Sequence, residues 1–431
     1  MLVQFTVAVD GRVVGEVQQQ LSGSAAEIEE QLRPVQQRTS RMVLEPALGQ
    51  IALQARAPHC CGHRMKNCGF RTIEVQTTCG PVPVARRRYR CLTCGHECDP
   101  ADAQICCGRH QVTRPLAQRA CQLAVDTHFT RLAGLMQDQH GLCLGHQLLW
   151  ELAHDVGTHA EQLRRADAAQ ARRHRDAPVT PDVTPQRVYV TLDGILYPTN
   201  LSEPDPDQPD QKRTVYHQMK VGAVYWQDER GEWHKRMTWG REGPEEFAAA
   251  LYRLACRCGY RQAREKIFAA DGADWCWDVQ ATYFSDATGI LDWFHASEHV
   301  WEAARQVNPQ NPKAWADAAL ERLHTTGGSA LCEWLREQQP HRRGHARTAL
   351  DQLIGYVAPR VERMNYPDSR KRGWQIGTGM VESTCKQLVG LRLKAPGMHG
   401  SESGALAITT LRATELNNQW HTFWKTLALA T

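Results

Sequence analysis

The pattern of hydrophobic and polar positions changes its period several times along the chain. A β-type alternation at Val3–Val9 gives way to a helical pattern that begins at Ser24 and continues into the thirties. Further on, strand-like runs at Arg71–Thr77 and Val82–Tyr89 lie between pairs of cysteines. These patterns predict an N-terminal region, residues 1–56, in which no chemistry is visible, followed by a small cysteine-rich β unit.

A helical region follows the cysteine-rich unit. Residues 113–175 are almost free of proline and rich in Leu, Ala, Gln and Arg, which favours helix. Thr127–Gln139, a break at Gly141 and Gly145–Val156 have the order helix, turn, helix, and Gly157 is predicted to end the second helix. This order predicts a helix-turn-helix DNA-binding region, although two antiparallel core helices have the same spacing.

The sequence pattern becomes typical of β-strands after a proline-containing linker at Asp176–Gln186. The predicted strands are Arg187–Leu192, Met219–Trp226, Trp233–Trp239, Lys266–Ala270 and Gly289–Trp293, with an amphipathic helix at Pro244–Cys258. A long helical stretch then runs from Ala296 to about Arg363, and Gly377-Thr378-Gly379 opens a last helix that carries Glu382. The chain is therefore predicted to be a multi-domain protein of the α/β (α+β) class.

Length and composition set limits on this picture. A chain of 431 residues is long enough for two or three domains, and no run of 18 apolar residues predicts a membrane span. Met1–Val17 lacks the features of a secretory signal, so we expect a cytoplasmic protein without a membrane partner, and the family resemblance described below implies a bacterial, nucleoid-associated one. The net charge is only +4, but basic residues are clustered, as at Arg86–Arg90, and such a cluster is either an ordinary solvated face or part of a nucleic-acid-binding surface.

The cysteines point to metal binding. There are 16, and seven of them fall between Cys60 and Cys98 in a chain without an export signal. Cys91-Leu-Thr-Cys94 is half of a zinc site, and the other half is predicted to be Cys61 with either His59 or Cys60. The remaining candidates are Cys98, Cys106 and Cys107, and the alternative for Cys91 and Cys94 is that they are free buried thiols.

Two aspartates suggest a second kind of metal site. Asp193 and Asp271 each end an apolar strand and precede a glycine, and active sites of open α/β sheets lie at the carboxyl ends of strands. With Glu382 on a helix, these carboxylates could hold two magnesium ions about 3.5–4 Å apart. The alternative is that each Asp-Gly pair is an ordinary turn.

Histidines and tryptophans accompany the aspartates. His295 follows Asp292 at a strand-to-helix turn, and His299 lies one helical turn later. The two histidines could bind zinc, contact phosphate, cap the helix or connect the strands, but Glu298 does not complete the His-Glu-x-x-His motif of a zinc hydrolase. The nearby tryptophans are interpreted as core residues: Trp275, Trp277 and Trp293.

Several of these stretches resemble insertion-sequence transposases of the ISKra type. They are Asp193-Gly194, Ala270–Trp275, Ile290–His299 and Ile376–Ser383, followed by Lys386 and Arg392-Leu393-Lys394. The resemblance covers residues 55 to 425. It implies a DDE transposase with an RNase H-like core, in which Asp193, Asp271 and Glu382 are catalytic and bind two Mg²⁺ or Mn²⁺ ions.

The resemblance also implies an order of parts and a set of supporting residues. The parts are an N-terminal region (1–56), a zinc-ribbon-like unit (57–110), a helix-turn-helix region (113–175), the first part of the core (187–299), a helical insertion (300–372) and the final core helices (373–431). The residues expected to support the carboxylates or to contact DNA are Asp292, His295, His299, Lys386, Arg392 and Lys394. The structural zinc is assigned to Cys61, Cys91, Cys94 and His59.

The activity that this reading implies is metal-dependent cleavage at the ends of an insertion sequence and strand transfer into target DNA. The partners would be double-stranded DNA, as terminal inverted repeats and as target, and further copies of the chain in a homo-dimer or larger oligomer. The alternative is a non-catalytic, zinc-containing DNA-binding regulator derived from a transposase. Such a regulator would tolerate loss of any of the three acids, so the intact set favours the enzyme.

Overall fold

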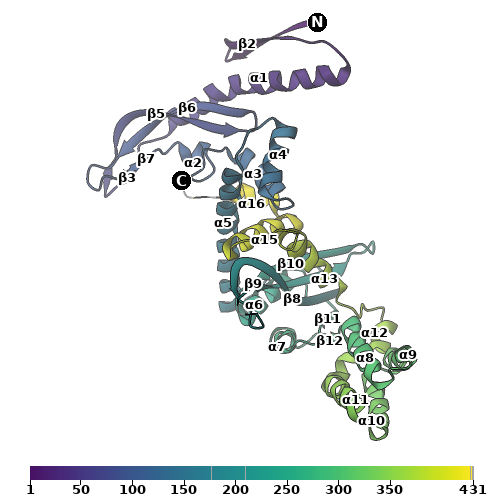
Figure 1. Ribbon diagram of the computed structural model, residues 1–431. Helices are drawn as coiled ribbons and strands as arrows, with labels where there is room; N and C mark the ends of the chain where they lie inside the picture. The colour runs from purple at the N-terminus through teal and green to yellow at the C-terminus, as the bar shows by residue number, and fades with distance from the viewer. Residues whose placement is uncertain (176, 209, 428, 430–431) are drawn as a thin grey trace. The chain divides into compact units, whose positions relative to one another are not determined.

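The computed structural model describes residues 1–175, 177–208, 210–427 and 429. The chain divides into two compact units: unit 1 comprises Met1–Glu161 and Leu406–Thr431, and unit 2 comprises Gln162–Ala405 (Figure 1). Each unit has its own hydrophobic core. None of the helices in the described part of the chain combines the length and apolarity that a membrane span requires.

Unit 1 begins with a hairpin of β1 (Leu2–Val9) and β2 (Arg12–Gln20) and a 30-residue helix, α1 (Ala25–Gln54). Ser24 and Glu27 form a capping box, so the helix begins where the sequence predicts. It extends much further than predicted, across Pro34 and Pro46. Burial explains the extension, because the C-terminal turns pack against the core of the cysteine-rich sheet and outweigh the unfavourable prolines.

The cysteine-rich part of unit 1 is β-structured. A short hairpin, β3 (His59–Cys60) and β4 (His63–Arg64), precedes an antiparallel three-stranded sheet. The strands of that sheet are β5 (Lys66–Thr77), β6 (Gly80–Arg90) and β7 (Glu97–Cys98). The two predicted strands are thus confirmed as β5 and β6, and each is longer than predicted.

The helical region consists of α2 (Asp102–Ile105), α3 (Arg114–Ala124), α4 (Phe129–His140) and α5 (His146–Arg173). The break at Gly141 is confirmed, because this glycine ends α4 with a φ of 62°.

The prediction that the helix ends at Gly157 is wrong, because α5 continues through this residue to Arg173. A Cβ at Gly157 would lie 2.5 Å from the carbonyl oxygen of Ala407 in α15 (Glu402–Leu416), so the glycine permits close helix packing. The last helix of unit 1 is α16 (Trp420–Thr426). The DNA-binding role of the helical region stays a prediction.

Unit 2 contains a five-stranded mixed sheet in the order β10-β9-β8-β11-β12. β8 pairs antiparallel with β9, which pairs antiparallel with β10, whereas β8, β11 and β12 are parallel. The strands are β8 (Arg187–Pro204), β9 (Lys212–Gln227), β10 (Trp233–Gly240), β11 (Glu265–Ala270) and β12 (Thr288–Leu291). This mixed α/β arrangement is compatible with an RNase H-like fold.

β8 differs from its prediction in a way that matters for the site. The sequence predicts that the strand ends at Leu192, whereas β8 continues to Pro204 with Asp193 inside it. Asp193 and Gly194 pair with Val221 and Lys220 of β9, so the Asp-Gly pair is not a turn. Cross-strand pairing overrides the local turn preference of these two residues.

The helices of unit 2 fall into two groups. α6 (Pro244–Arg257), α7 (Asp274–Tyr283) and the start of α8 (Trp293–Val307) connect or follow the strands and share their core. Trp277 is buried in this core and Trp275 and Trp293 pack against it, so their interpretation as core residues is confirmed.

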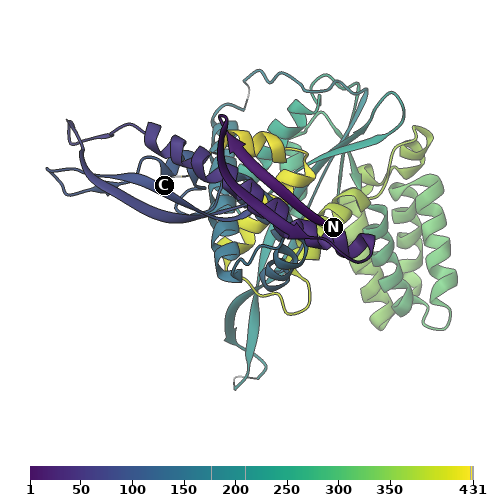
Figure 2. The same cartoon turned by 90° about the horizontal axis from the view of Figure 1, so that it is seen from above.

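The second group is a helical bundle between β12 and Glu382. α8, α9, α10 and α11 pack side by side in it, as Figure 2 shows in green. After α8, its members are α9 (Pro312–Thr326), α10 (Gly328–Gln338), η1 (Gln339–His341), α11 (Gly344–Val357), η2 (Ala358–Met364) and α12 (Tyr366–Lys371). The chain then returns to the sheet through α13 (Gly379–Cys385), the π-helix η3 (Lys386–Gly390) and α14 (Leu391–Leu393).

Candidate functional site

The register of the parallel strands brings two predicted aspartates level with each other. Arg187 of β8 pairs with Glu265 of β11, and Thr191 pairs with Ala269, so partners are 78 positions apart at both ends of the ladder. Two residues further along both segments, where β11 has just ended, the same offset relates Asp193 to Asp271. Adjacent strands lie about 4.8 Å apart, so the two carboxylates emerge side by side at the carboxyl end of the ladder.

Glu382 reaches the same place from a helix. It lies on α13, which packs against β8 and β9, although it follows the sheet by a whole helical bundle. The pKa of Asp193 is raised, chiefly by burial and also by the negative charges of Asp271 and Glu382. The three carboxylates therefore form one electrostatically coupled group.

This group has the chemistry of a divalent-cation site. Its donors are oxygens only, as Mg²⁺ prefers, and a bound cation would relieve the repulsion and the desolvation that act on Asp193. Among the described residues, the ligand oxygens of Asp193, Asp271 and Glu382 do not all lie within 4.8 Å of one another. The three side chains are therefore not arranged around a single shared ion.

Hydrogen bonds fix the backbone and side chain of Asp271. Its Oδ1 accepts from the backbone N–H of Ala273 at 3.0 Å, and its carbonyl oxygen accepts from the indole N–H of Trp277 at 2.9 Å. In the bundle, Nη2 of Arg360 donates to the carbonyl oxygen of Gly272 at 3.2 Å. The loop after β11 is thus held by both α7 and the helical bundle.

Asp292 connects two elements of the site. It is 3% exposed, and its Oδ2 accepts from the backbone N–H of His295 at 2.8 Å, which caps α8. Its Oδ1 accepts from the backbone N–H of Thr378 at 2.7 Å, and the hydroxyl of Thr378 donates to Oε1 of Glu382 at 2.9 Å. Asp292 therefore joins the end of β12 to the turn that presents Glu382.

His295 and His299 lie on α8 beside the helical bundle. Their ring centroids are 4.9 Å apart, and the centroid of His299 is 3.9 Å from that of Tyr356 on α11. Within the described residues, no further acidic, histidine or cysteine side chain joins the pair to make a three-ligand metal group. The geometry gives the histidines aromatic neighbours and does not support a zinc site.

Two buried thiols touch the aspartates, and sequence reasoning missed both. Sγ of Cys276 is 3.6 Å from Oδ1 of Asp271, and Sγ of Cys385 is 3.9 Å from Oδ2 of Asp193. Burial first, and the neighbouring carboxylates second, raise the pKa of both thiols, so they stay protonated and donate weakly. The position of Cys385 one helical turn after Glu382 was the only available sequence signal.

The basic residues after Glu382 differ in exposure. Lys386, in the π-helix, and Lys394 are exposed. Arg392 is 7% exposed, and its Nη1 is 3.3 Å from the sulfur of Met398. Of the three basic residues among those expected to contact DNA or to support the carboxylates, the two lysines are accessible on the surface of unit 2.

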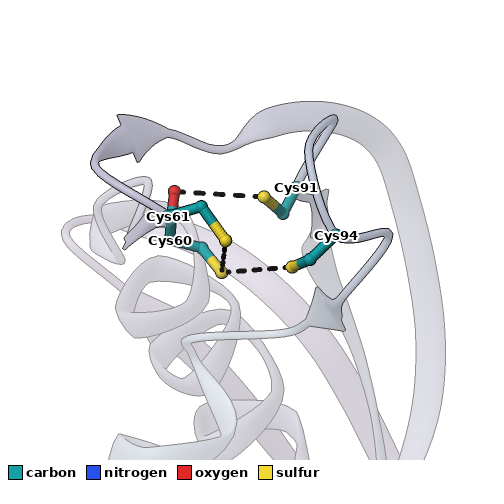
Figure 3. Close-up of side chains that lie close together, drawn as sticks. All are labelled: Cys60, Cys61, Cys91 and Cys94. Atoms are coloured by element: carbon teal, nitrogen blue, oxygen red, sulfur yellow. Dashed lines mark hydrogen bonds between the residues drawn. The ribbon is translucent and has the colours of Figure 1, made fainter.

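Unit 1 contains a cluster of four cysteines: Cys60, Cys61, Cys91 and Cys94 (Figure 3). Their sulfur atoms all lie within 4.8 Å of one another, which is the arrangement of a tetrahedral zinc site. Cys61 has a φ of 49°, and this left-handed turn lets two adjacent cysteines face the same point. Cys60 thus joins the three predicted cysteines, whereas His59 lies outside the cluster.

The pKa values of two thiols in the cluster are shifted in opposite directions. Backbone N–H groups of Cys94 and Thr93 lower the pKa of Cys91 to about 6, and hydrogen bonding to Cys94 raises the pKa of Cys60 to about 12. Cys60 Sγ is 3.5 Å from Cys94 Sγ. A zinc ion would displace the remaining thiol protons and bind four thiolates.

A second three-residue group that could hold a metal was not foreseen. Asp228, Glu232 and His234 lie in and after the turn between β9 and β10, with Nε2 of His234 2.8 Å from Oδ2 of Asp228. Oδ1 of Asp228 accepts from the backbone N–H groups of Arg230 and Glu232. These hydrogen bonds stabilise the turn, and this explains why the three side chains lie close together.

Comparison with known proteins finds only a weak structural similarity. No family model matches the chain, and no curated protein matches it. Among solved structures, a similarity was found to the Drosophila P element transposase strand transfer complex, at 9% identity and a TM-score of 0.25. The match covers 74% of this chain and 81% of that one. A similarity of this size carries no argument about function.

Proposed function

We propose that the chain is a DDE-type transposase, a polynucleotidyl transferase that cuts the ends of an insertion sequence and joins them to target DNA. The observation that carries the proposal is the convergence of Asp193, Asp271 and Glu382. Asp193 in β8 and Asp271, directly after β11, are related by the register of two neighbouring parallel strands, and burial together with the charges of Asp271 and Glu382 raises the pKa of Asp193. The resemblance to ISKra-type transposases and the mixed sheet of an RNase H-like core agree with this assignment.

Asp193, Asp271 and Glu382 would hold two Mg²⁺ or Mn²⁺ ions. When bound, such ions activate an attacking hydroxyl and stabilise charge on the phosphodiester that is cut. The protein residues provide position and preorganisation. Asp292 and Thr378 orient Glu382, and Trp277 and the Ala273 backbone orient Asp271.

Unit 1 would recognise the ends of the element. The four-cysteine cluster would hold a structural Zn²⁺ and fix the hairpin β3-β4 against the β6–β7 turn. The helices α3 to α5 would provide the helix-turn-helix function, with Arg and Lys on phosphates and a few side chains on base edges. A homo-dimer or larger assembly would hold two ends together.

The test is a cleavage and strand-transfer assay with purified protein, labelled DNA that carries the sequences flanking the gene, and Mg²⁺ or Mn²⁺. We expect cuts at the repeat ends that depend on the metal and fall at least about 1000-fold in Asp193→Asn, as loss of an electrostatic catalytic group predicts. Asp228→Asn is the control, because this aspartate belongs to the metal-capable turn away from the carboxylate group.

The outcomes separate the enzyme from the regulator. Cuts that survive in Asp193→Asn would contradict the assigned site. Tight, sequence-specific binding without cutting under either metal would identify a non-catalytic DNA-binding protein derived from a transposase.

A further inference from the structure

The N-terminal hairpin β1-β2 is a sheet of only two strands, which lies along α1 in unit 1 (Figure 1). Its turn is Asp10-Gly11, and the φ angles of 49° and 76° are of the kind that closes a two-residue hairpin. Among the described residues, neither strand pairs with a third strand along its outer edge. A two-stranded hairpin alone is marginally stable in water, so this one depends on what packs against it.

The helix α1 covers one face of the hairpin unevenly. It packs mainly on β2, where Val17 is 4% exposed and a Cβ at Gly15 would lie 2.8 Å from the sulfur of Met42. The residues of β1 that share this face form an apolar stripe: Val3, Phe5, Val7 and Val9. All four are only partly buried, so one helix leaves the stripe half open.

The two outer edges of the hairpin differ in charge and in regularity. β2 carries Arg12 and Glu16, and it has one extra residue, Val14, opposite the step from Val7 to Ala8. Charged side chains and bulges are features that keep an edge strand from pairing with another strand. β1 contains no charged residue and no proline over its eight residues, Leu2–Val9. The edge of β1 is therefore open to pairing, whereas the edge of β2 is protected.

The sequence of β1 is complementary to itself about a two-fold axis. When two copies of a strand pair antiparallel around such an axis, the residue on the axis faces its own counterpart, and each face of the sheet keeps its own set of residues. With the axis at Phe5, Val3 lies opposite Val7 of the partner subunit. With the axis at Thr6, Phe5 lies opposite Val7 of the partner subunit. In both registers the two stripes join on one face, and no like charges meet because β1 has none.

We propose that β1 pairs antiparallel with β1 of a second copy of this chain, so that two hairpins form one four-stranded sheet beneath two α1 helices. The joined stripes give the two helices a common apolar surface to cover. The outer strands of this sheet are the two copies of β2, whose charges and bulge prevent further pairing, so assembly through this edge stops at two copies. That such a dimer holds two ends of an element together rests on the proposed function, whereas the interface itself does not depend on DNA cleavage.

The experiment measures the mass of the full chain in solution without DNA, by analytical ultracentrifugation over a range of protein concentrations. We expect the wild-type protein to be a dimer. Val7→Lys should raise the dimer dissociation constant at least about 100-fold, because each dimer would bury two unpaired ammonium groups. The matched control is Val14→Lys, which adds the same charge at a residue of β2 that is 40% exposed, and it should leave the dissociation constant unchanged.

Two further measurements guard against a misfolded variant. Val7 is only partly buried within one copy, so a lysine there can extend to water, and the circular dichroism spectrum should match that of the wild-type protein. Thr6→Cys, at an exposed position of β1, should give a covalent dimer with a short bismaleimide, above the background of the native cysteines. Glu16→Cys should not, because three strand spacings, about 14 Å, separate it from its counterpart. A monomeric wild-type chain, a dimer that persists in Val7→Lys, or equal dissociation of both lysine variants would overturn the proposal.

The interface and the transferase can fail separately. A dimer that depends on β1, in a protein that does not cut DNA in Mg²⁺, supports the interface and rejects the enzyme. Cutting in Mg²⁺ by a chain that is monomeric without DNA supports the enzyme and rejects the interface.

Discussion

At the residue scale, the sequence indicates individual groups better than their contacts. Asp193, Asp271 and Asp292 are visible because each follows a short apolar run, and local sequence determines that. Glu382 has no such signal, and its assignment depends on the family resemblance. The contacts of Cys276 and Cys385 with the aspartates could not be foreseen, because Cys385 meets a residue 192 positions away.

Asp292 provides a prediction at this scale. Both of its carboxylate oxygens accept backbone N–H groups, so Asp292→Asn would place an amide NH₂ against a donor in a buried site. We expect a loss of about 1–3 kcal/mol in the free energy of unfolding, measured by urea denaturation. DNA cleavage should fall as well, because the turn that presents Glu382 loses its support.

The control for this variant is Asp317→Asn, which changes a half-exposed carboxylate in an i,i+4 pair on α9. Its effect should stay within about 0.5 kcal/mol. If Asp292→Asn were equally mild in stability and activity, the two hydrogen bonds would not be what holds the Glu382 turn.

At the element scale, most strands and helices are predicted near their observed positions, and the errors concern where they end. β8 runs 12 residues past its predicted end because β9 pairs with it, and α1 crosses two prolines because its last turns are buried. Such extensions depend on partners distant in sequence. Local patterns of propensity and turn residues do not contain that information.

Gly157 provides a prediction about the packing of α5 against a helix that is distant in sequence. A Cβ there would lie 2.5 Å from a backbone oxygen of Ala407, so Gly157→Ala should force α5 and α15 apart. We expect a loss of about 1–3 kcal/mol in the free energy of unfolding. Gly134→Ala is the matched control on α4, where a Cβ would meet nothing within 4 Å.

The control variant Gly134→Ala should be more stable than the wild-type protein. Replacing a helical glycine by alanine in open space should add about 0.5–1 kcal/mol, because alanine has the higher helix propensity. The same substitution would thus have opposite signs at two sites, measured as urea midpoints. Equal shifts at both would mean that α5 does not pack closely at Gly157.

At the scale of the whole molecule, the order of parts predicted from the sequence is cysteine-rich unit, helices, sheet, helical bundle and final helices, and the structure has these elements in that order. The sequence does not show that the C-terminal residues from Leu406 onward belong to the same compact unit as the N-terminal residues. This closure depends on packing between distant helices, as between Gly157 and Ala407, which no local pattern encodes.

The two units give the last prediction, which concerns removal of zinc. Four thiolates that share one ion stabilise the hairpin β3-β4 only while the metal is bound, because four sulfurs this close repel when deprotonated. Cys94→Ser should therefore lose the zinc that elemental analysis detects at about one per chain. Cys68→Ser, an exposed cysteine outside the cluster, should retain it.

The consequence for stability should be confined to unit 1. Chelation should increase hydrogen exchange in β3 to β7 and leave the sheet of unit 2 protected, since the two units have separate cores. Retention of zinc should also fall as the pH falls, because protons compete with the ion for the thiolates. Retained zinc in Cys94→Ser, or equal deprotection of both sheets, would contradict a structural site in this cluster.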